Sequence, residues 1–217
     1  MLKDWSNVII PEEEEINERL EKARNKLVQQ QILIMQKKLP VLVSFDGWGA
    51  AGKGSILGKI IKNIDPRFFK VAVMDKPTED EKRRPFLYRY VINIPEAGKF
   101  TFMDGGCLDE VTKQKLSGKI TDEEYKRKIE SVKRFERQLS DNGYLVIKFF
   151  FHIGEQEQRK RLTRLLDDKN TRWRVSEYDW WQNQHYKKSL KAFDQFIDDT
   201  SQSIAPWYIV DATDKKW

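Results

Sequence analysis

The chain has 217 residues, of which 34% are charged and 12% are aromatic, and its formal net charge is +6. This length suits one α/β domain with a sizeable core, and the composition is that of a globular rather than a disordered chain. The basic balance favours a polyanionic partner, and the absence of an RNP, zinc-finger or helix-turn-helix signature argues against nucleic acid.

The first predicted element is a long helix over residues 12–38. Pro11 stands at its start, acidic residues fill its first turn and basic residues its end, which is the arrangement that the helix dipole favours. Pro40 then precedes an apolar, β-branched run over residues 41–45, which predicts a strand buried on both faces. A glycine-rich turn follows, and the pattern restarts as a helix over residues 54–63.

Strands and helices continue to alternate along the rest of the chain. We expect strands over residues 68–74, 100–104, 144–152 and 206–211, and helices over residues 79–91, 121–141, 155–166 and 176–200. This order predicts a single domain over residues 1–217 of the α/β class. Its fold is three-layer α/β/α, with about five parallel strands between helices. Ligands bind such sheets at the carboxyl ends of the strands.

The turn after the first strand reads G-x-x-x-x-G-K-G-S from Gly47 to Ser55. Glycines let backbone N–H groups converge, and the free N–H groups of the next helix point at a phosphate. Lys53 would reach the β- and γ-phosphates, although Gly54 stands where the usual pattern has Ser or Thr. The predicted phosphate-binding residues around Lys53 are Gly47, Gly49, Ala50, Ala51, Gly52, Gly54 and Ser55. The alternative is a tight turn with a surface lysine.

Two acidic residues end predicted strands beside this turn. Phosphoryl transfer needs positioning, cations and a metal ion that neutralises the moving group. Asp104 stands at the Walker B position, where an acid binds Mg²⁺ directly or through water, although it could instead cap a following helix. Asp46 is either a second magnesium-side carboxylate or a support for the loop. The expected cofactor is therefore Mg²⁺, with Asp104 and Asp46 as candidate ligands.

A basic segment over residues 159–174 carries seven bases against two acids. A basic flap over a phosphate site can exclude water and stabilise transition-state charge. We predict a lid over about residues 167–180 with Arg172 and Arg174 as its catalytic cations, and a solvated helix face over residues 159–164.

Residues 45–54, Phe-Asp-Gly-Trp-Gly-Ala-Ala-Gly-Lys-Gly, resemble the F-E-G-x-D-A-A-G-K-G loop of the polyphosphate kinase 2 family. Further matches follow in register from about Gln29, including unusual tryptophans and arginines. They are Pro77–Glu81, Phe86–Arg89, Pro95–Gly98, Phe135–Arg137, Lys148–His152, Glu157-Gln158, Arg172–Ser176, Asp179-Trp180 and Ala205–Trp207.

The resemblance implies a P-loop kinase-like fold with a helical lid. It also implies magnesium-dependent phosphoryl transfer between inorganic polyphosphate and a nucleotide such as AMP, ADP, GMP or GDP, and a homo-oligomer. By resemblance, Arg89 and Lys148 are phosphate-binding cations, Asp104 is the Walker B acid, and Arg172 and Arg174 are lid cations. From the residue pattern alone, Arg89 either contacts a ligand or lies on the surface.

Two departures from the family pattern favour the alternative that the chain binds the family's ligands but is a poor catalyst. The family's loop acid is Gly49 here, and its D-R-S-W-Y-N-R-A stretch is replaced over residues 104–111. One magnesium-side carboxylate and nearby arginines are therefore missing. The chain is either an active phosphotransferase or a catalytically impaired domain that binds polyphosphate or nucleotide and supports a catalytic partner half. A conventional ATP-dependent small-molecule kinase is a third reading. We expect slow turnover that Gly49→Asp improves, provided that the turn tolerates a side chain.

Neither a membrane span nor a signal peptide is expected, because no apolar run approaches about 18 residues and the N-terminus lacks an apolar segment.

Cys107 is the single cysteine of the sequence, so no internal disulfide can form. We expect a packing role for Cys107 in a cytoplasmic protein. The chain stops soon after its last predicted strand, which suits part of a longer protein.

Overall fold

Five parallel strands form the centre of the part of the chain that the structure describes, which is residues 2 and 11–214 of a computed structural model. The strands are β1 (Val41–Gly47), β2 (Phe69–Val73), β3 (Phe100–Asp104), β4 (Leu145–His152) and β5 (Trp207–Asp211), in the spatial order β2-β3-β1-β4-β5. The helices are α1 (Glu13–Gln36), α2 (Lys53–Ile61), α3 (Glu79–Lys82), α4 (Tyr88–Val91), α5 (Cys107–Leu116), α6 (Asp122–Asp141), α7 (Glu155–Asp167), α8 (Glu177–Gln184) and α9 (Tyr186–Thr200).

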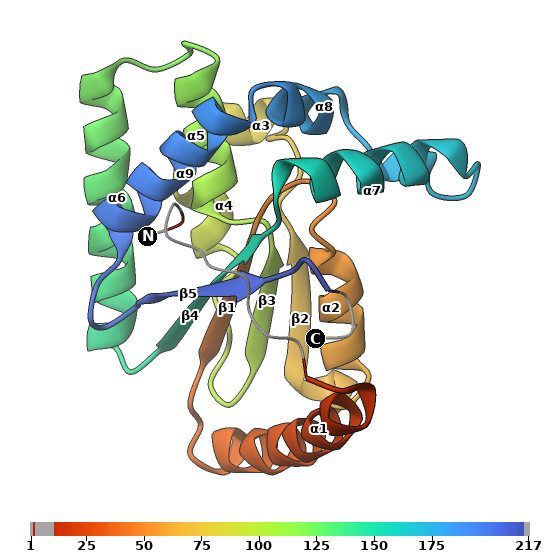
Figure 1. Ribbon diagram of the computed structural model, residues 1–217. Helices are drawn as coiled ribbons and strands as arrows, with labels where there is room; N and C mark the ends of the chain where they lie inside the picture. The colour runs from red at the N-terminus through yellow and green to blue at the C-terminus, as the bar shows by residue number, and fades with distance from the viewer. Residues whose placement is uncertain (1, 3–10, 215–217) are drawn as a thin grey trace.

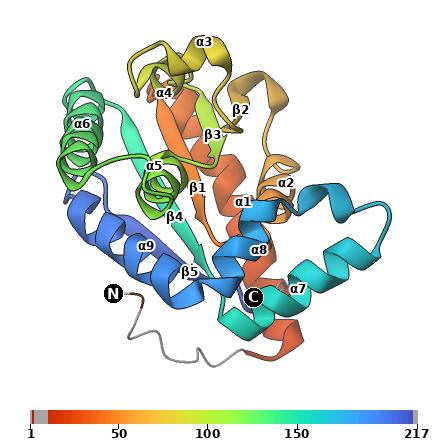
Figure 2. The ribbon, with the colours of Figure 1, turned by 90° about the horizontal axis from the view of Figure 1, so that it is seen from above.

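Helices cover both faces of this sheet, as Figures 1 and 2 show. On one face α6 packs against β4 and α5 against β1, and α9 packs on both helices. On the other face α2 packs against β1 and β3. Helix α1 crosses the foot of the sheet where the strands begin (Figure 1). This arrangement confirms the predicted α/β fold with its parallel sheet of five strands, although the predicted bounds 1–217 extend beyond the described residues.

The apolar run that predicts the first strand does form a strand buried on both faces. All positions of β1 except Ser44 are buried. Phe45 stacks on Phe151 of β4, with ring centroids 5.8 Å apart, and lies 6.2 Å from Phe102 of β3. The central strand is thereby fixed on both sides, which holds its carboxyl end, and the loop that follows, in one position.

Two predicted helices need correction, and a third helix is absent from the sequence prediction. The helix predicted over residues 79–91 is two short helices, α3 and α4, because Pro85 lacks an N–H donor and disfavours helical backbone before it. The helix predicted over residues 176–200 bends at His185, where φ is −113° and ψ is 37°, and becomes α8 and α9. Helix α5 was not predicted, although Leu108, Val111 and Thr112 form its buried stripe with helical spacing.

The α7–α8 hairpin projects from the end of the sheet where the strands finish (Figures 1 and 2). A short 3₁₀ turn, η3 (Arg172–Arg174), lies between the two helices. Within the described residues, no helix is both long enough and apolar enough to cross a membrane.

Candidate functional site

The loop between β1 and α2 needs glycine at two positions. Gly47 has a φ of +138°, and a Cβ there would lie 2.7 Å from the backbone nitrogen of Phe151. Gly52 has a φ of +98° and stands immediately before α2. Both conformations disfavour any residue with a side chain. The loop is thus turned sharply away from β1 and into the first turn of α2.

The start of α2 leaves donors without helical partners. The first helical bond across the turn runs from Ile56 N–H to the Gly52 carbonyl, and Gly52 offers no side-chain cap. The N–H groups of residues 53–55 therefore point out of the helix, with its positive dipole end behind them. The Lys53 ammonium lies across the loop and donates to the carbonyls of Gly47 at 3.1 Å and Trp48 at 3.0 Å. This geometry suits an anion.

Hydrogen bonds from the root of the α7–α8 hairpin, which is the start of α7 and the end of α8, hold the other side of the loop. The Gln182 side-chain carbonyl accepts from Gly49 N–H at 2.9 Å and from the Gln158 amide at 2.8 Å. Both glutamines are fully buried. Gly49 N–H is therefore already occupied, which leaves the N–H groups at the start of α2 for a ligand.

Arg161 of α7 completes this attachment. Its guanidinium donates to the Ala51 carbonyl at 3.2 Å and to the carbonyls of Ala212 and Thr213 at 2.8 and 2.7 Å. The side chain is 5% exposed. The prediction of a solvated face over residues 159–164 is therefore wrong for Arg161, which supports the loop.

Asp104 and Asp46 have different surroundings at this edge. Asp104 ends β3, and its Oδ2 would lie 3.7 Å from a Cβ built on Gly54, so it faces the first turn of α2. Asp46 is 1% exposed and accepts from Gly106 N–H at 2.9 Å and from the Ser44 hydroxyl. Burial raises the pKa of Asp46 to about 6, with the Ser44 hydrogen bond acting the other way. Asp46 thus ties β1 to the turn after β3, and its predicted role as a metal ligand does not fit this environment.

Two acids that the sequence analysis does not name as site residues also lie near the loop. Asp109 of α5 interacts electrostatically with Lys53, Lys113 and Asp179, and burial raises the pKa of its carboxyl group. Asp179 of α8 lies against Gly49: a Cβ on that glycine would be 2.8 Å from Asp179 Cγ and closer still to Oδ1. A side chain at position 49 would therefore require the Asp179 side chain to move, and the expectation for Gly49→Asp stays a prediction. Neither acid belongs to the loop segment: the resemblance includes Asp179 among its matches, and nothing in the local pattern indicates Asp109.

Carboxylates near a phosphate loop are chemically suited to Mg²⁺. The described residues contain no group of three or more His, Cys, Asp or Glu side chains that could hold a metal ion by themselves. Mg²⁺ commonly takes one or two carboxylates and completes its shell with phosphate oxygens and water. Asp104 and its acidic neighbours fit that kind of site, in which the ligand supplies part of the coordination.

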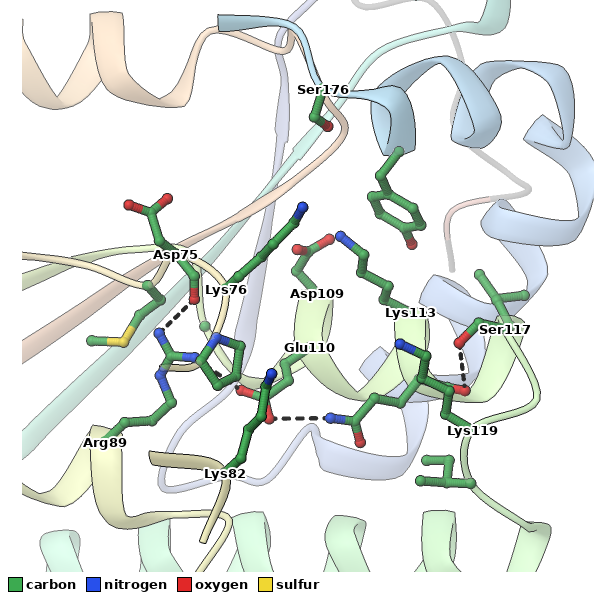
Figure 3. Close-up of a pocket in the computed structure, with 18 of the residues that line it drawn as sticks. Asp75, Lys76, Lys82, Arg89, Asp109, Glu110, Lys113, Ser117, Lys119 and Ser176 are labelled. Carbon is green, nitrogen blue, oxygen red and sulfur yellow. Dashed lines mark hydrogen bonds and ion pairs between the residues drawn. The ribbon is translucent and has the colours of Figure 1, made fainter. Parts of the chain in front are cut away.

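A cavity of about 1020 Å³ lies between the ends of β2 and β3, α5 and the start of α8. Figure 3 shows Asp109 and Lys113 entering it from α5 and Lys76 from the segment after β2. Lys113 also lies 3.9 Å above the Tyr178 ring. The basic residues that line the cavity are Lys76, Lys82, Arg89, Lys113 and Lys119, against Asp75, Asp109 and Glu110. Positively charged side chains therefore outnumber negatively charged ones around the cavity.

Arg89 and Lys148, the two cations that the resemblance adds, lie in different places. Arg89 lines the cavity and donates to the Asp75 carbonyl at 2.6 Å, while its buried Nε has no hydrogen-bond partner among the described residues. Lys148 is buried and donates to both Glu136 oxygens at 2.8 and 2.9 Å and to the Thr200 carbonyl at 2.9 Å. Since these bonds use all three of its donors, the structure places Lys148 outside the site.

Arg172 and Arg174 lie at the exposed tip of the α7–α8 hairpin. Within the described chain neither guanidinium makes a hydrogen bond or an ion pair, and Arg174 lies 5.2 Å from the ring centroid of Trp173. Trp173 itself is 75% exposed. The predicted lid residues are thus unconstrained, and their approach to a ligand stays a prediction.

A parallel sheet, a glycine-rich loop after its central strand and a lysine at the start of the next helix define a P-loop kinase-like fold. The family model described as Polyphosphate kinase 2 (PPK2) matches residues 11–217. The chain therefore belongs to the polyphosphate kinase 2 family. A solved structure of a putative polyphosphate kinase 2 from Pseudomonas aeruginosa PA01 is 27% identical, with a TM-score of 0.92 over 99% of this chain and 46% of that one.

Two curated relatives differ in how much of them this chain covers. A polyphosphate:AMP phosphotransferase from Pseudomonas syringae pv. tomato is 32% identical over 83% of this chain and 36% of its own length. An AMP/ADP-polyphosphate phosphotransferase from Meiothermus ruber is 29% identical over 93% of this chain and 73% of its own length. The chain thus spans little more than a third of the first relative and most of the second.

Proposed function

We propose that this chain transfers phosphate between inorganic polyphosphate and a nucleoside mono- or diphosphate, with Mg²⁺ as cofactor. The observation that carries the proposal is the start of α2, where three N–H groups without helical partners and Lys53 lie beside Asp104. Asp109 interacts with Lys53 and also lines the cationic cavity, so the cavity is next to this anion site. The names of the Pseudomonas syringae and Meiothermus ruber relatives support polyphosphate as one substrate and AMP or ADP as the other.

The chain's own residues would bind and orient the two substrates. The N–H groups of residues 53–55 would hold one phosphate group while the Lys53 ammonium exchanges its two carbonyl partners for phosphate oxygens. Mg²⁺, held on Asp104, would neutralise charge on the phosphate chain. Arg172 and Arg174, which have no competing ion pair in the described part of the chain, would close over it and exclude water.

The cavity is our proposed acceptor site. Its volume of about 1020 Å³ is large enough for a nucleotide, since small-molecule pockets commonly measure roughly 300–1,000 Å³. Arg89 and the lysines supply cationic contacts for its phosphates, and Tyr178 and Trp181 supply apolar surface for its base. AMP, ADP, GMP and GDP all fit this chemistry.

A second candidate is an impaired domain that binds polyphosphate or nucleotide and supports a catalytic partner half. It is favoured by Gly49, which removes the family's loop acid, and by the altered residues 104–111. The small share of the Pseudomonas syringae relative that this chain covers supports it as well. We also propose a cytoplasmic location and self-association, which light scattering of the purified chain would check.

The two candidates are separated by one experiment. The purified chain is incubated with polyphosphate, Mg²⁺ and AMP, ADP, GMP or GDP, and new nucleotide is measured by chromatography beside calorimetric binding of the same ligands. New nucleotide that depends on polyphosphate supports the first candidate. Binding that weakens steeply with salt, without turnover, supports the second. Absence of both, even at low salt, contradicts the proposal.

A further inference from the structure

A second, smaller pocket adjoins the proposed acceptor cavity and is enclosed by residues of α3, α4, α5 and α6 and of the segment between α3 and α4. Its volume is about 220 Å³. Its charged lining residues are Glu81, Lys82, Arg84, Arg89, Glu110 and Lys128. Of these, Lys82, Arg89 and Glu110 also line the larger cavity (Figure 3). Cations thus outnumber acids in the small pocket, and Arg89 belongs to both spaces.

We propose that the small pocket binds one phosphate group, held by the Arg89 guanidinium and the Lys128 ammonium. The site goes beyond the proposed function, because phosphate transfer at the loop does not require it. A volume of about 220 Å³ lies below the roughly 300–1,000 Å³ of pockets that take whole small molecules, so it suits a single oxyanion group. That group is either free orthophosphate or a phosphate of a nucleotide in the adjoining cavity.

Arg89 has a buried donor that the folded chain does not use. The residue is 7% exposed, and its Nη2 donates to the Asp75 carbonyl at 2.6 Å. Its Nε is buried and has no hydrogen-bond partner among the described residues. The nearest carboxylate oxygens stand off at 4.0 Å (Glu81 to Nε) and 3.8 Å (Glu110 to Nη1), which exceeds hydrogen-bond length. Because an unsatisfied buried donor costs free energy, a ligand oxygen on Arg89 would stabilise the pocket.

Lys128 brings a second cation without an acceptor, from the opposite wall on α6. Its ammonium lies 3.9 Å from the centroid of the Phe86 ring, and within the described chain it makes no hydrogen bond or ion pair. Burial lowers the pKa of this side chain. Lys82 and Arg84 differ from it, because both already form exposed ion pairs with acids of α3. Lys128 and Arg89 are therefore the two cations of the pocket with capacity for a ligand.

Glu110 opposes the binding of an anion at Arg89. One of its oxygens accepts from the Tyr90 hydroxyl at 2.9 Å and lies 3.8 Å from Arg89, while the other accepts from Gln114 at 3.3 Å. Neutral donors thus hold a carboxylate beside the guanidinium, where its charge would repel phosphate. Removing this charge should strengthen phosphate binding, and removing that of Lys128 should weaken it.

The test measures binding of ³²P-labelled orthophosphate by equilibrium dialysis, which requires no turnover. Lys53→Ala is the starting protein, so that the loop after β1 does not contribute, and it should still bind orthophosphate. Adding Lys128→Met keeps an apolar stem against Phe86 and should weaken binding at least about tenfold, the loss expected for one charge-assisted hydrogen bond. Adding Glu110→Gln instead keeps an oxygen for Tyr90 and should strengthen binding about threefold or more.

A matched control and a stability measurement make the test specific. Lys126→Met removes the same charge from an exposed position of α6 and should leave orthophosphate affinity within about twofold. Lys128→Met should melt at or above the temperature of its parent, because the charge that it removes is partly buried. Calorimetric titration with AMP identifies the source of the group. Weaker AMP binding in Lys128→Met assigns it to the nucleotide, and unchanged AMP binding assigns it to free orthophosphate.

The inference is overturned if Lys53→Ala binds no orthophosphate at millimolar concentrations, or if Lys128→Met and Lys126→Met weaken binding equally. It is also overturned if Glu110→Gln weakens binding in a protein that melts normally. Failure of the proposed function is a separate result, since it would appear as absence of phosphate transfer to nucleotide whatever the dialysis shows.

Discussion

Lys53 and Asp46 are seven residues apart, and burial gives them different roles. Asp46 lies under the loop with its oxygens engaged by Gly106 N–H and the Ser44 hydroxyl. Lys53 is half-buried, and its two hydrogen-bond acceptors are carbonyls of the loop itself. A ligand phosphate can replace such carbonyls, whereas no ligand can reach Asp46 without opening the fold. Lys53 should therefore act in binding and Asp46 in stability.

Lys53→Ala should abolish detectable binding of tripolyphosphate, or reduce turnover by roughly 10²–10³, because the charge facing the phosphate is lost. The melting temperature should stay close to that of the wild type, since the lysine is partly exposed. Calorimetry and thermal unfolding measure both. Lys62→Ala, at the exposed position that ends α2, is the control and should change neither. Unchanged phosphate affinity in Lys53→Ala would leave the loop as a structural turn.

Asp46→Asn should change the pH dependence of stability. The pKa of Asp46 is about 6 in the folded protein against 3.8 for the unperturbed group, so the folded state binds a proton more tightly between these values. Its contribution to the free energy of unfolding therefore falls as pH rises from about 4 to about 6, by roughly 3 kcal/mol in total. Asn does not titrate. Urea unfolding of both proteins across this range should show that difference, and a pH-independent difference would refute it.

The sequence showed the loop residues because they are neighbours in the chain. Spacing alone identifies Lys53 and the two glycines that the turn requires, and an acid at the end of a predicted strand identifies Asp104. Asp179 and Gln182 reach the same loop from about 130 residues away, through the packing of α8. No local pattern encodes such a contact, and the burial that decides the role of Asp46 is equally invisible in sequence.

Among the elements, the α7–α8 hairpin has a fixed root and an exposed tip. At the root, Gln158 and Gln182 hold Gly49, and Asn183 donates to the side-chain oxygen of Gln158 at 3.0 Å. At the tip, the residues around η3 are mostly exposed. The lid predicted over about residues 167–180 therefore combines an exposed tip with Asp179, which lies against Gly49 of the loop.

Hydrogen exchange should divide the hairpin in the same way. Amides of residues 168–176 should exchange fast in the free chain and slow when polyphosphate and nucleotide are both added, because few apolar contacts hold them until the ligands bind. Amides at the ends of α7 and α8 nearest the loop should be protected in both states. Equal exchange at the tip with and without ligands would count against a closing lid.

Gln182→Met should destabilise the chain by about 1–3 kcal/mol, because Gly49 N–H and the Gln158 amide would lose a buried acceptor. Gln195→Met is the matched control: that glutamine is exposed on α9 and bonds Asp199 at the surface. Chemical unfolding of the two variants beside wild type gives the comparison. Equal stability of both variants would show that the loop does not depend on α8.

Strand prediction succeeded and helix prediction partly failed for physical reasons. The inner strands β1 and β3 are apolar runs because both faces of the sheet are covered there, so each is visible in isolation. The edge strand β2 is mostly exposed and is visible from its β-branched residues instead. The division of one predicted helix at His185 depends on packing: Gln182 and Asn183 face α7, while Phe193 and Ile197 after the bend are fully buried in the core. A continuous helical pattern does not encode that change of direction.

At the scale of the whole molecule, charge and architecture converge on one edge of the sheet. The loop, Asp104, the cationic cavity and the root of the lid all lie where the strands end, the usual ligand edge of such sheets. The opposite end is crossed by α1 (Figure 1). The net charge of +6 suits an extended polyanion that reaches this edge from solution.

The central claim is that phosphate moves from polyphosphate to a nucleotide at the loop after β1. The most direct measurement incubates the chain with ³²P-labelled polyphosphate, Mg²⁺ and unlabelled AMP or ADP, with Lys53→Ala as a parallel sample. We predict label on the nucleotide with the wild-type chain and none above background with Lys53→Ala. Label that never reaches the nucleotide, or that reaches it equally with both proteins, would contradict the claim.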